Sequence, residues 1–370
     1  MMEHAGTVIL GGGVVGLACA RALAQAGEPV LLLEAEPALG QGISSRSSEV
    51  IHAGLYYPEG SLKAALCCRG RELLYAYCAA RGVGHRKLGK LVVAADAAGE
   101  TALETLRDRG TRLGVPGLAC LTGRELKRRA PALTGAAALW SPETGIVDSH
   151  GLIQALAGDA QAAGAELINH TRVTRLEVEA RGLVLLGTSA GEALALRAPR
   201  VVNAAGFGAF PLAQGLGAPE AEAEGPFYAA GHYFSYSGPV PVDHLVYPLP
   251  EAGGLGIHLT FDLAGQARFG PDVGWRTTED YSFRAEPARF AAAIQSYFPG
   301  LEPARLQPAY VGLRPKRVAQ GAAAADFGWV EQAFGGETGV LHLLGIESPG
   351  LTSALALGER VAARWQGGWA

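Results

Sequence analysis

Three glycines and one glutamate near the start of the chain have the types and spacing of a dinucleotide-binding site. Gly11, Gly13 and Gly16 form the pattern G-x-G-x-x-G, and Glu34 stands eighteen residues after the last of them. The first glycine permits a tight turn, the second lets a pyrophosphate approach the backbone, and the third lets a helix lie close to a strand. A carboxylate at Glu34 can accept hydrogen bonds from ribose hydroxyls. We therefore expect an ADP-ribose-containing cofactor, either NAD or FAD.

Two histidines could contribute proton transfer because an imidazole titrates near neutral pH. His52 is followed by small residues that leave room for a flat ligand, and it comes after a run of small polar groups at 44–48 that could wrap around a cofactor. His258 lies in the alternating segment 255–261, on the face that also carries a glycine and a threonine. That face suits a pocket wall, and a structural sheet histidine is the alternative.

An arginine in the last third of the chain could hold an anion. Arg314 follows an expected strand at 310–313, and Pro315 restricts it to an extended conformation. A guanidinium can pair with a carboxylate through two parallel hydrogen bonds. Lys316 and Arg317 come next, where they could serve a second carboxylate or form part of a solvated basic turn.

The glycine motif is embedded in the elements that would position it. A strand at 7–10, a helix from Val14 that ends before Gly27, and a strand at 30–33 form one βαβ unit. The free N–H groups and the positive dipole end of this helix point toward a bound phosphate.

Later elements return the chain toward this unit. They are a helix from Ser61 to Gly82, a charged helix over 98–113, a capping box at Thr122 and Glu125, a helix from Asp148 or Ser149 to about Ala163, strands at 166–170 and 172–179, a hairpin at 182–186 and 193–196, a buried strand at 201–203, strands at 232–236 and 245–249, a helix over 287–298, and a final strand at 341–345 that turns into a helix over 354–365.

Two segments make the chain resemble a known family. They are GGGVVGLACA at 11–20 and SSRSSEVIHAGLYYPEGSLKA at 44–64. Together they are similar to the flavin oxidoreductases of the D-amino-acid oxidase superfamily, and within it to the L-2-hydroxyglutarate dehydrogenase and oxidase branch. The piece IHAGLYY at 51–57 is the most specific, and the resemblance extends over nearly the whole chain.

The resemblance implies an α/β (α+β) protein of two domains. A Rossmann-like FAD-binding domain of glutathione-reductase type is expected from residues 1–85, 146–225 and 313–370. A substrate domain with a mixed or antiparallel sheet is expected from 86–145 and 226–312. At 370 residues, two domains are also the default for a chain of this length.

The resemblance also implies a set of flavin contacts. The expected FAD-binding residues are Gly11, Gly13, Val14, Val15, Gly16, Glu34, Ala35, Ser44, Ser45, Arg46, Ser48, Val173, Ala204, Ala205, Gly206, Arg314, Gly350, Leu351, Thr352 and Ser353. The turn at 345–353 would aim a second helix N-terminus at the flavin and stabilise negative charge on the reduced ring. No cysteine lies beyond Cys120, so non-covalent attachment is expected.

The expected reaction is oxidation of a small 2-hydroxy acid, L-2-hydroxyglutarate to 2-oxoglutarate, by hydride transfer to flavin N5. His52 and His258 are the candidate bases, and Arg314 is the expected carboxylate clamp. The alternatives are an amino-acid or amine oxidase of the same superfamily, a protein like glycerol-3-phosphate dehydrogenase, and a flavin-binding sensor without turnover. The electron acceptor would be O2 or a membrane quinone.

Composition narrows the partners. The net charge is −4 and no basic block is present, which disfavours nucleic acid. The five cysteines contain no C-x-x-C pair, so neither a metal site nor a disulfide framework is expected. The uncharged run at 7–20 lacks a basic leader and is too short to span a bilayer. We expect a cytoplasmic protein, with peripheral contact at the inner membrane face as the accompanying possibility.

Overall fold

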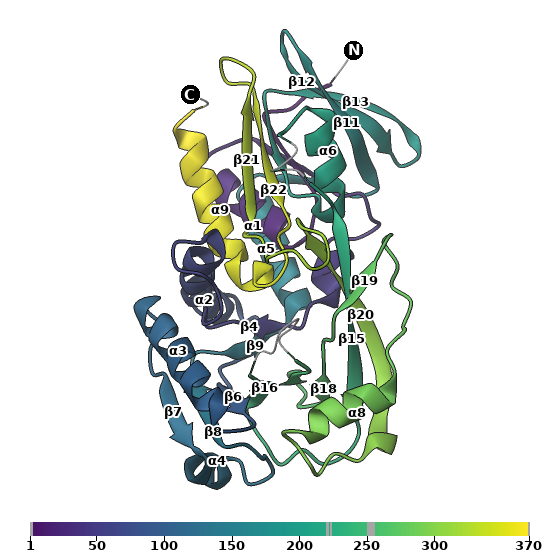
Figure 1. Cartoon of the computed structure of the whole chain (residues 1–370). Coiled ribbons are helices and arrows are strands. Elements are labelled where there is room, and N and C mark those ends of the chain that lie inside the picture. Colours follow the sequence, from purple (N-terminus) through teal and green to yellow (C-terminus); the bar gives the residue numbers. More distant parts are fainter. Residues whose placement is uncertain (1–2, 220–221, 223, 250–255, 369–370) are drawn as a thin grey trace.

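A computed structural model describes residues 3–219, 222, 224–249 and 256–368 (Figure 1). Four sheets account for the strands, and the two largest contain six and nine strands. Figure 1 places the six-stranded sheet with its helices in the upper part of the molecule and the nine-stranded sheet below it. The expected α/β class, with a Rossmann-like part and a mixed-sheet part, is confirmed. The residue boundaries proposed for the two domains remain a prediction.

The six-stranded sheet is built on the predicted βαβ unit. Its order is β10 (Glu166–Ile168), β3 (Val30–Leu33), β2 (Thr7–Leu10), β14 (Arg200–Asn203), β22 (Gly339–Leu344) and β21 (Gly328–Ala333). The first five strands are parallel, and β21 pairs antiparallel with β22. Parallel strands with helical crossovers are buried on both faces, which explains why these segments are so continuously apolar.

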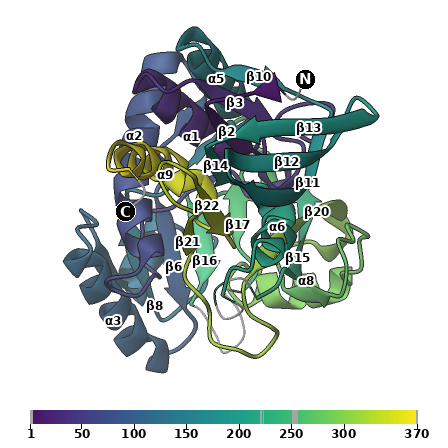
Figure 2. The same cartoon turned by 90° about the horizontal axis from the view of Figure 1, so that it is seen from above.

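Alternate side chains of this sheet face different layers. Ile9 and Val202 belong to the core shared with the helices, whereas Val8 and Val201 belong to the core shared with a four-stranded sheet. The helices are α1 (Val14–Gln25), α2 (Leu62–Arg81), α5 (Ser149–Ala162) and α9 (Gly350–Gln366). The four-stranded sheet has the order β1 (Glu3–His4), β13 (Glu192–Ala198), β12 (Gly182–Ser189) and β11 (Thr171–Glu179). Figure 2 shows the two layers on opposite sides of the strands.

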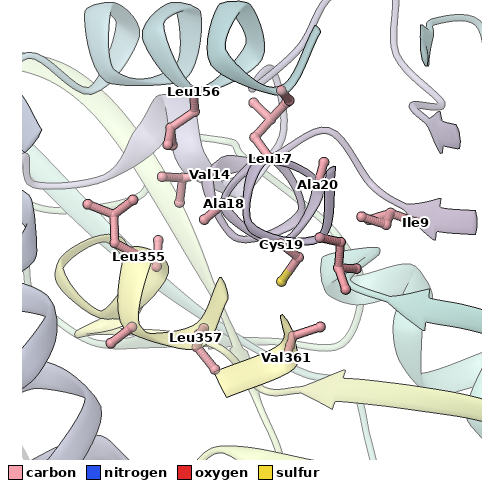
Figure 3. Close-up of a cluster of buried hydrophobic side chains, with 14 of the residues drawn as sticks. Ile9, Val14, Leu17, Ala18, Cys19, Ala20, Leu156, Leu355, Leu357 and Val361 are labelled. Atoms are coloured by element: carbon pink, nitrogen blue, oxygen red, sulfur yellow. The ribbon is translucent and has the colours of Figure 1, made fainter. Parts of the chain in front are cut away.

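Helix α1 lies between α5 and α9, and its side chains fill the space on both sides. In Figure 3, Leu17 points toward Leu156 of α5, and Cys19 points toward α9. The two helices α1 and α9 approach closely at Gly358, where an added Cβ would lie 2.4 Å from the carbonyl oxygen of Ala18. This packing fixes the N-termini of both helices relative to the sheet.

The nine-stranded sheet carries the second large core. Its order is β19 (Gly274–Arg276), β15 (Phe227–Tyr236), β18 (Ala267–Phe269), β17 (Leu259–Phe261), β16 (Leu245–Pro248), β6 (Lys90–Ala94), β8 (Ala137–Ser141) and β7 (Ala119–Thr122), with β20 (Leu306–Lys316) paired to β15. It is covered by α3 (Ala98–Arg112), α4 (Gly123–Arg129) and α8 (Pro287–Gln295). A small sheet of β4 (Val50–Ile51), β9 (Gly145–Val147) and β5 (His85–Arg86) links the two parts. The remaining elements are α6 (Ala209–Gly215) and the short 3₁₀ turns at Ile43–Arg46, Gly206–Gly208 and Pro303–Arg305.

Several elements have different limits from those predicted. Strand β20 does not end at residue 313, because β15 pairs with it through Arg314 opposite Ala229 and Lys316 opposite Phe227. Helix α9 begins at Gly350 instead of 354. Helix α8 ends at Gln295, and the predicted strand at 255–261 is strand only from 259, its first residue lying outside the described ranges.

A buried histidine makes the sheet sensitive to acid. His342 in β22 is fully buried, with Nδ1 2.8 Å from the Asn203 amide nitrogen and Nε2 2.9 Å from the Gln332 oxygen. Burial lowers the pKa of His342 to about 4. Because the folded pKa is depressed, the neutral ring stabilises the fold fully above about pH 6.5, and this contribution is lost as the pH falls toward 4.

We therefore expect the free energy of unfolding to fall by up to about 3 kcal/mol between pH 7 and pH 4 on account of His342 alone. Denaturant unfolding of the wild type and of His342→Gln at several pH values measures this, since glutamine does not titrate. His150→Gln, on the exposed side of α5, is the matched control. If the free energy of unfolding depended on pH equally in the wild type and in His342→Gln, His342 would not be the titrating group.

Among the described helices, none combines the length and hydropathy that crossing a bilayer requires. The described residues also contain no group of three or more His, Cys, Asp or Glu side chains arranged to hold a metal ion.

Candidate functional site

A cavity of about 1540 Å³ opens between the six-stranded and the nine-stranded sheets. It is larger than the roughly 300–1,000 Å³ of most small-molecule pockets, as a dinucleotide together with a substrate requires. Its wall combines the glycine turn, the serine run after β3, the ends of β14 and β22, and side chains of β15, β16 and β20. The chain thus brings its first, middle and last thirds to one site.

The glycine turn leaves no space for side chains. Gly11 has φ +102°, and a Cβ there would lie 2.6 Å from the carbonyl oxygen of Ala204. A Cβ on Gly16 would lie 1.9 Å from the carbonyl oxygen of Gly11. At the start of α1, the Val14 N–H donates to Ser44 Oγ at 3.0 Å, which aims the serine run at the helix N-terminus. This cradle fits a pyrophosphate.

We expect Gly11→Ala to lower FAD affinity at least about 100-fold, because the left-handed backbone and the contact with Ala204 both disfavour a side chain. Gly158→Ala in α5 is the control, since a Cβ there meets nothing within 4 Å. The ratio of flavin to protein after purification and the Kd of added FAD measure the effect. A fully loaded Gly11→Ala protein would refute it.

Glu34 is held at the cavity wall by the backbone. Its Oε2 accepts from the Gly12 N–H at 2.5 Å and its Oε1 from the Glu36 N–H at 2.7 Å. The residue is only 9% exposed, and it lines the cavity. Each carboxylate oxygen has a further lone pair, so the group can still accept from ribose hydroxyls.

Most of the expected FAD contacts lie on the cavity wall. Those that line it are Gly11, Gly13, Val14, Val15, Glu34, Ala35, Ser44, Arg46, Ser48, Val173, Ala204, Ala205, Gly206, Arg314, Gly350 and Leu351. Four do not, namely Gly16, Ser45, Thr352 and Ser353. Gly16 lies behind the turn, and the Ser45 hydroxyl is engaged by the carbonyl oxygens of Gln41 and Gly42, each 2.9 Å away.

Thr352 supports the site from behind. It is fully buried, and its Oγ1 accepts from the His52 N–H at 3.0 Å and donates to the Val50 carbonyl oxygen at 3.3 Å. The first turn of α9 therefore fixes the backbone of the segment that carries His52.

His52 lines the cavity in its neutral form. Its Nε2 lies 3.2 Å from Ser348 Oγ, and its Nδ1 is buried without a hydrogen-bond partner. Burial, and secondarily the nearby Lys90 ammonium, lowers the pKa of His52 to about 3. A neutral imidazole with a nitrogen at the cavity wall is able to accept a proton.

His258 also reaches the cavity, but from the position just before β17 and not from within the predicted strand. Its ring stacks on Tyr247 with centroids 3.4 Å apart and an interplanar angle of 4°. The residue is 5% exposed, so little of the ring is free to move.

Arg314 enters the cavity from near the C-terminal end of β20. Its Nη2 donates to the Asp272 carbonyl oxygen at 2.9 Å. The Asp272 carboxylate is in turn held by His232, through the backbone N–H at 2.8 Å and Nδ1 at 2.7 Å. The guanidinium therefore has a braced position and keeps donors available for an anion.

Lys316 is not part of a solvated turn, which corrects the simpler of the two interpretations of the basic run. It and Lys63 both pair with Glu347, at 2.7 and 3.1 Å. All three side chains line the cavity beside the start of α9. Arg317 donates to the carbonyl oxygens of Asp326 and Glu222.

Sequence reasoning missed several wall residues. They are Lys63, Tyr56, Tyr57, Tyr233, Tyr247 and Glu347. Of these, Tyr56 and Tyr57 carried a usable signal, because they stand in the segment IHAGLYY. The others belong to a helix, strands and a loop whose neighbours are distant in sequence.

Comparison with known proteins gives the context of this geometry. The family model described as "FAD dependent oxidoreductase" matches residues 7–364. The chain is 41% identical to the mitochondrial L-2-hydroxyglutarate dehydrogenase of Arabidopsis thaliana, over 97% of this chain and 83% of that protein. It is 28% identical to the L-2-hydroxyglutarate dehydrogenase of Escherichia coli K12, over 97% and 92%.

Solved structures share the whole fold. The FAD-bound L-α-glycerophosphate oxidase of Mycoplasma pneumoniae aligns with a TM-score of 0.87 at 25% identity, covering 100% of this chain and 96% of that one. The glycine oxidase of Geobacillus kaustophilus aligns with a TM-score of 0.80 at 21% identity, covering 100% and 96%.

Proposed function

Since this chain belongs to the FAD dependent oxidoreductase family, we propose that it oxidises L-2-hydroxyglutarate to 2-oxoglutarate. The protein is an FAD-dependent oxidoreductase acting on a CH–OH donor. The observation that carries the proposal is the convergence of His52 and Arg314 on the cavity that contains the glycine turn. One supplies a proton acceptor and the other a carboxylate partner, as oxidation of a 2-hydroxy acid requires.

FAD, when bound, supplies the acceptor for the hydride that leaves the substrate Cα. The hydroxyl proton goes to the neutral imidazole of His52, whose Nε2 lies 3.2 Å from Ser348 Oγ. With the hydride and the proton gone, the C–O single bond becomes a double bond, which gives the 2-oxo acid. His258 is the alternative proton acceptor.

Arg314 binds the carboxylate next to the reacting carbon. Its guanidinium is oriented by the Asp272 carbonyl, so it does not need to be ordered when substrate binds. The Lys63–Glu347–Lys316 cluster carries one net positive charge next to the N-terminus of α9. Positive charge there would favour negative charge on a bound flavin ring.

Two other substrates follow from the similar structures. An oxidase of glycerol phosphate shares the fold at a TM-score of 0.87, and that substrate also has a hydroxyl carbon and an anionic group. A glycine oxidase shares it at 0.80, and an amino acid needs the same carboxylate clamp but less of a base. A substrate panel separates the three.

Anaerobic bleaching of the flavin near roughly 450 nm tests the proposal. The purified protein is mixed with L- and D-2-hydroxyglutarate, L-lactate, glycerol 3-phosphate and a set of amino acids. Fast bleaching by L-2-hydroxyglutarate alone is the expected result. Bleaching by amino acids or by glycerol 3-phosphate in its place would overturn the proposal.

The second half-reaction transfers the electrons to O2 or to a membrane quinone. Oxygen consumption under steady turnover favours the first, and reduction of a soluble quinone analogue without oxygen uptake favours the second. With a quinone acceptor, we propose that a cytoplasmic enzyme contacts the inner face of the membrane. Co-sedimentation with lipid vesicles tests this contact.

A further inference from the structure

Lys90, in β6, is a buried cation without an anionic partner. The residue is 1% exposed, and no carboxylate of the described residues forms an ion pair with it. Its Nζ lies 4.5 Å from the ring centroid of Tyr56 and 4.4 Å from that of Tyr247. Two aromatic faces offset only part of the cost of burying an ammonium group, so an anion bound nearby would favour the charged form of this lysine.

Two further polar atoms beside Lys90 are unsatisfied. The Tyr56 hydroxyl oxygen and His52 Nδ1 are both buried without a hydrogen-bond partner. Tyr56, Tyr247 and His52 line the cavity, whereas Lys90 itself stands behind the two tyrosines. Buried polar atoms are normally paired, so these atoms mark the place where a polar ligand group completes the wall.

The cations that line the cavity wall itself are already engaged. Lys63 and Lys316 pair with Glu347, Arg172 pairs with Glu36, Arg46 donates to the Val311 carbonyl oxygen, and Arg314 donates to the Asp272 carbonyl oxygen. Arg314 retains free donors, and the proposed function assigns it the carboxylate next to the reacting carbon. Lys90 therefore provides the positive charge for a second anionic group.

We propose that Tyr56 and Lys90 form the subsite for the distal carboxylate of a dicarboxylic substrate. The Tyr56 hydroxyl donates a hydrogen bond to this carboxylate. The Lys90 ammonium, which lies against the rings of Tyr56 and Tyr247, attracts the carboxylate electrostatically. The proposal rests on the proposed function and deepens it, because it explains how the cavity would select a 2-hydroxy diacid over a 2-hydroxy monoacid.

The position of the subsite agrees with this role. Arg314 and Tyr247 are both electrostatic neighbours of Tyr233, and all three residues line the cavity. Burial lowers the pKa of Lys90 to about 7, with the Cys67 thiol opposing the shift and His52, Tyr56 and Tyr247 as the other titratable neighbours. A bound carboxylate would restore the charged form of the lysine.

The test compares a diacid with the monoacid of equal chain length. Glutarate and pentanoate are titrated into the FAD-loaded protein, and the perturbation of the flavin spectrum gives each Kd without turnover. The wild type should bind glutarate more tightly. Lys90→Met should weaken glutarate about 100-fold and leave pentanoate within about threefold, and Tyr56→Phe should weaken glutarate about 10-fold.

Turnover gives the second readout. In Tyr56→Phe, kcat/KM should fall for L-2-hydroxyglutarate but not for L-2-hydroxypentanoate. Lys87→Met is the matched control, because Lys87 lies three residues earlier and is half-exposed, pairing with Glu143. If Lys90→Met does not fold, Tyr56→Phe still decides, since it removes one oxygen atom only.

The outcomes separate the two proposals. A wild type that turns over L-2-hydroxyglutarate, with unchanged glutarate Kd in both variants, would overturn the distal subsite and leave the proposed function intact. A wild type that is not reduced by L-2-hydroxyglutarate would overturn the proposed function. Equal weakening of glutarate and pentanoate would also refute the subsite, because it would indicate general damage to the pocket.

Discussion

Replacement of His52 with asparagine is expected to lower kcat on the hydroxy acid about 1000-fold, while FAD remains bound. The reason is the protonation state of the ring. Burial and the Lys90 ammonium lower the pKa of His52 to about 3, so the imidazole is unprotonated throughout the physiological range. Asparagine keeps a polar group of similar size and cannot take up the proton.

The sign of the pH dependence follows from the same shift. A base must be unprotonated to act, and a lowered pKa keeps it unprotonated down to acidic pH. His52 in the free enzyme should therefore impose no acid limb on kcat/KM between pH 8 and pH 5. An imidazole with an ordinary pKa would impose one near pH 6.5.

Stopped-flow reduction of the flavin measures the chemical step directly. His258→Asn is made in parallel, and His244→Asn is the control, because His244 contacts the Leu88 carbonyl oxygen and Trp140. A larger loss of the reduction rate in His258→Asn than in His52→Asn would transfer the role of base to His258. Similar rates in all variants would show that neither histidine accepts the proton.

The parts of the site that could be predicted from the sequence are those made by local structure. The glycine turn needs three glycines within six residues, and its strand, helix and glutamate are all its neighbours in the chain. The capping box at Thr122 and Glu125 and the N-cap at Ser61 are equally local, and the structure contains both. In each case the signal and the contact lie within one element.

The charged groups of the wall could not be predicted, because their meaning depends on distant partners. Lys63 and Glu347 are separated by 284 positions. Glu49 has φ +59°, an uncommon backbone state for a glutamate, and its carboxylate accepts from Ser149 and pairs with Arg268. Lys90 is the first residue of the buried strand β6, and only the fold reveals that no carboxylate of the described residues pairs with it.

Arg314 illustrates both cases. Its type and the following proline predicted an extended, anion-binding arginine, and the structure does place it on the cavity wall. The contacts that hold the Arg314 guanidinium in place could not be predicted from the sequence. The partner strand β15 carries Gly231, where an added Cβ would lie 2.5 Å from Arg314 Nη2, and the Asp272 carbonyl comes from a loop 42 residues away.

The second large effect is expected from Arg314→Met, which should lower kcat/KM on L-2-hydroxyglutarate about 1000-fold, mainly through KM. Methionine keeps the length and apolar stem of the side chain but loses the bidentate pair with the substrate carboxylate, and a desolvated charge pair of this kind is worth several kilocalories per mole. The affinity for FAD should change less than kcat/KM, because the glycine turn and Glu34 are expected to bind the pyrophosphate and ribose of the cofactor.

Arg314→Lys distinguishes charge from geometry. Lysine retains the positive charge but presents no planar fork, so it should recover only part of the activity.

Gly231→Ala tests the same interaction without changing the arginine, since the added methyl group would displace the guanidinium from the position that Asp272 sets. Steady-state kinetics on the four proteins measures the effects, with Arg305→Met as the control, because Arg305 is exposed in the turn just before the same strand. A normal KM in Arg314→Met would mean that another group binds the carboxylate. A raised KM in both Arg314→Met and Gly231→Ala, with an unchanged KM in Arg305→Met, would show that substrate binding depends on the guanidinium in its fixed position.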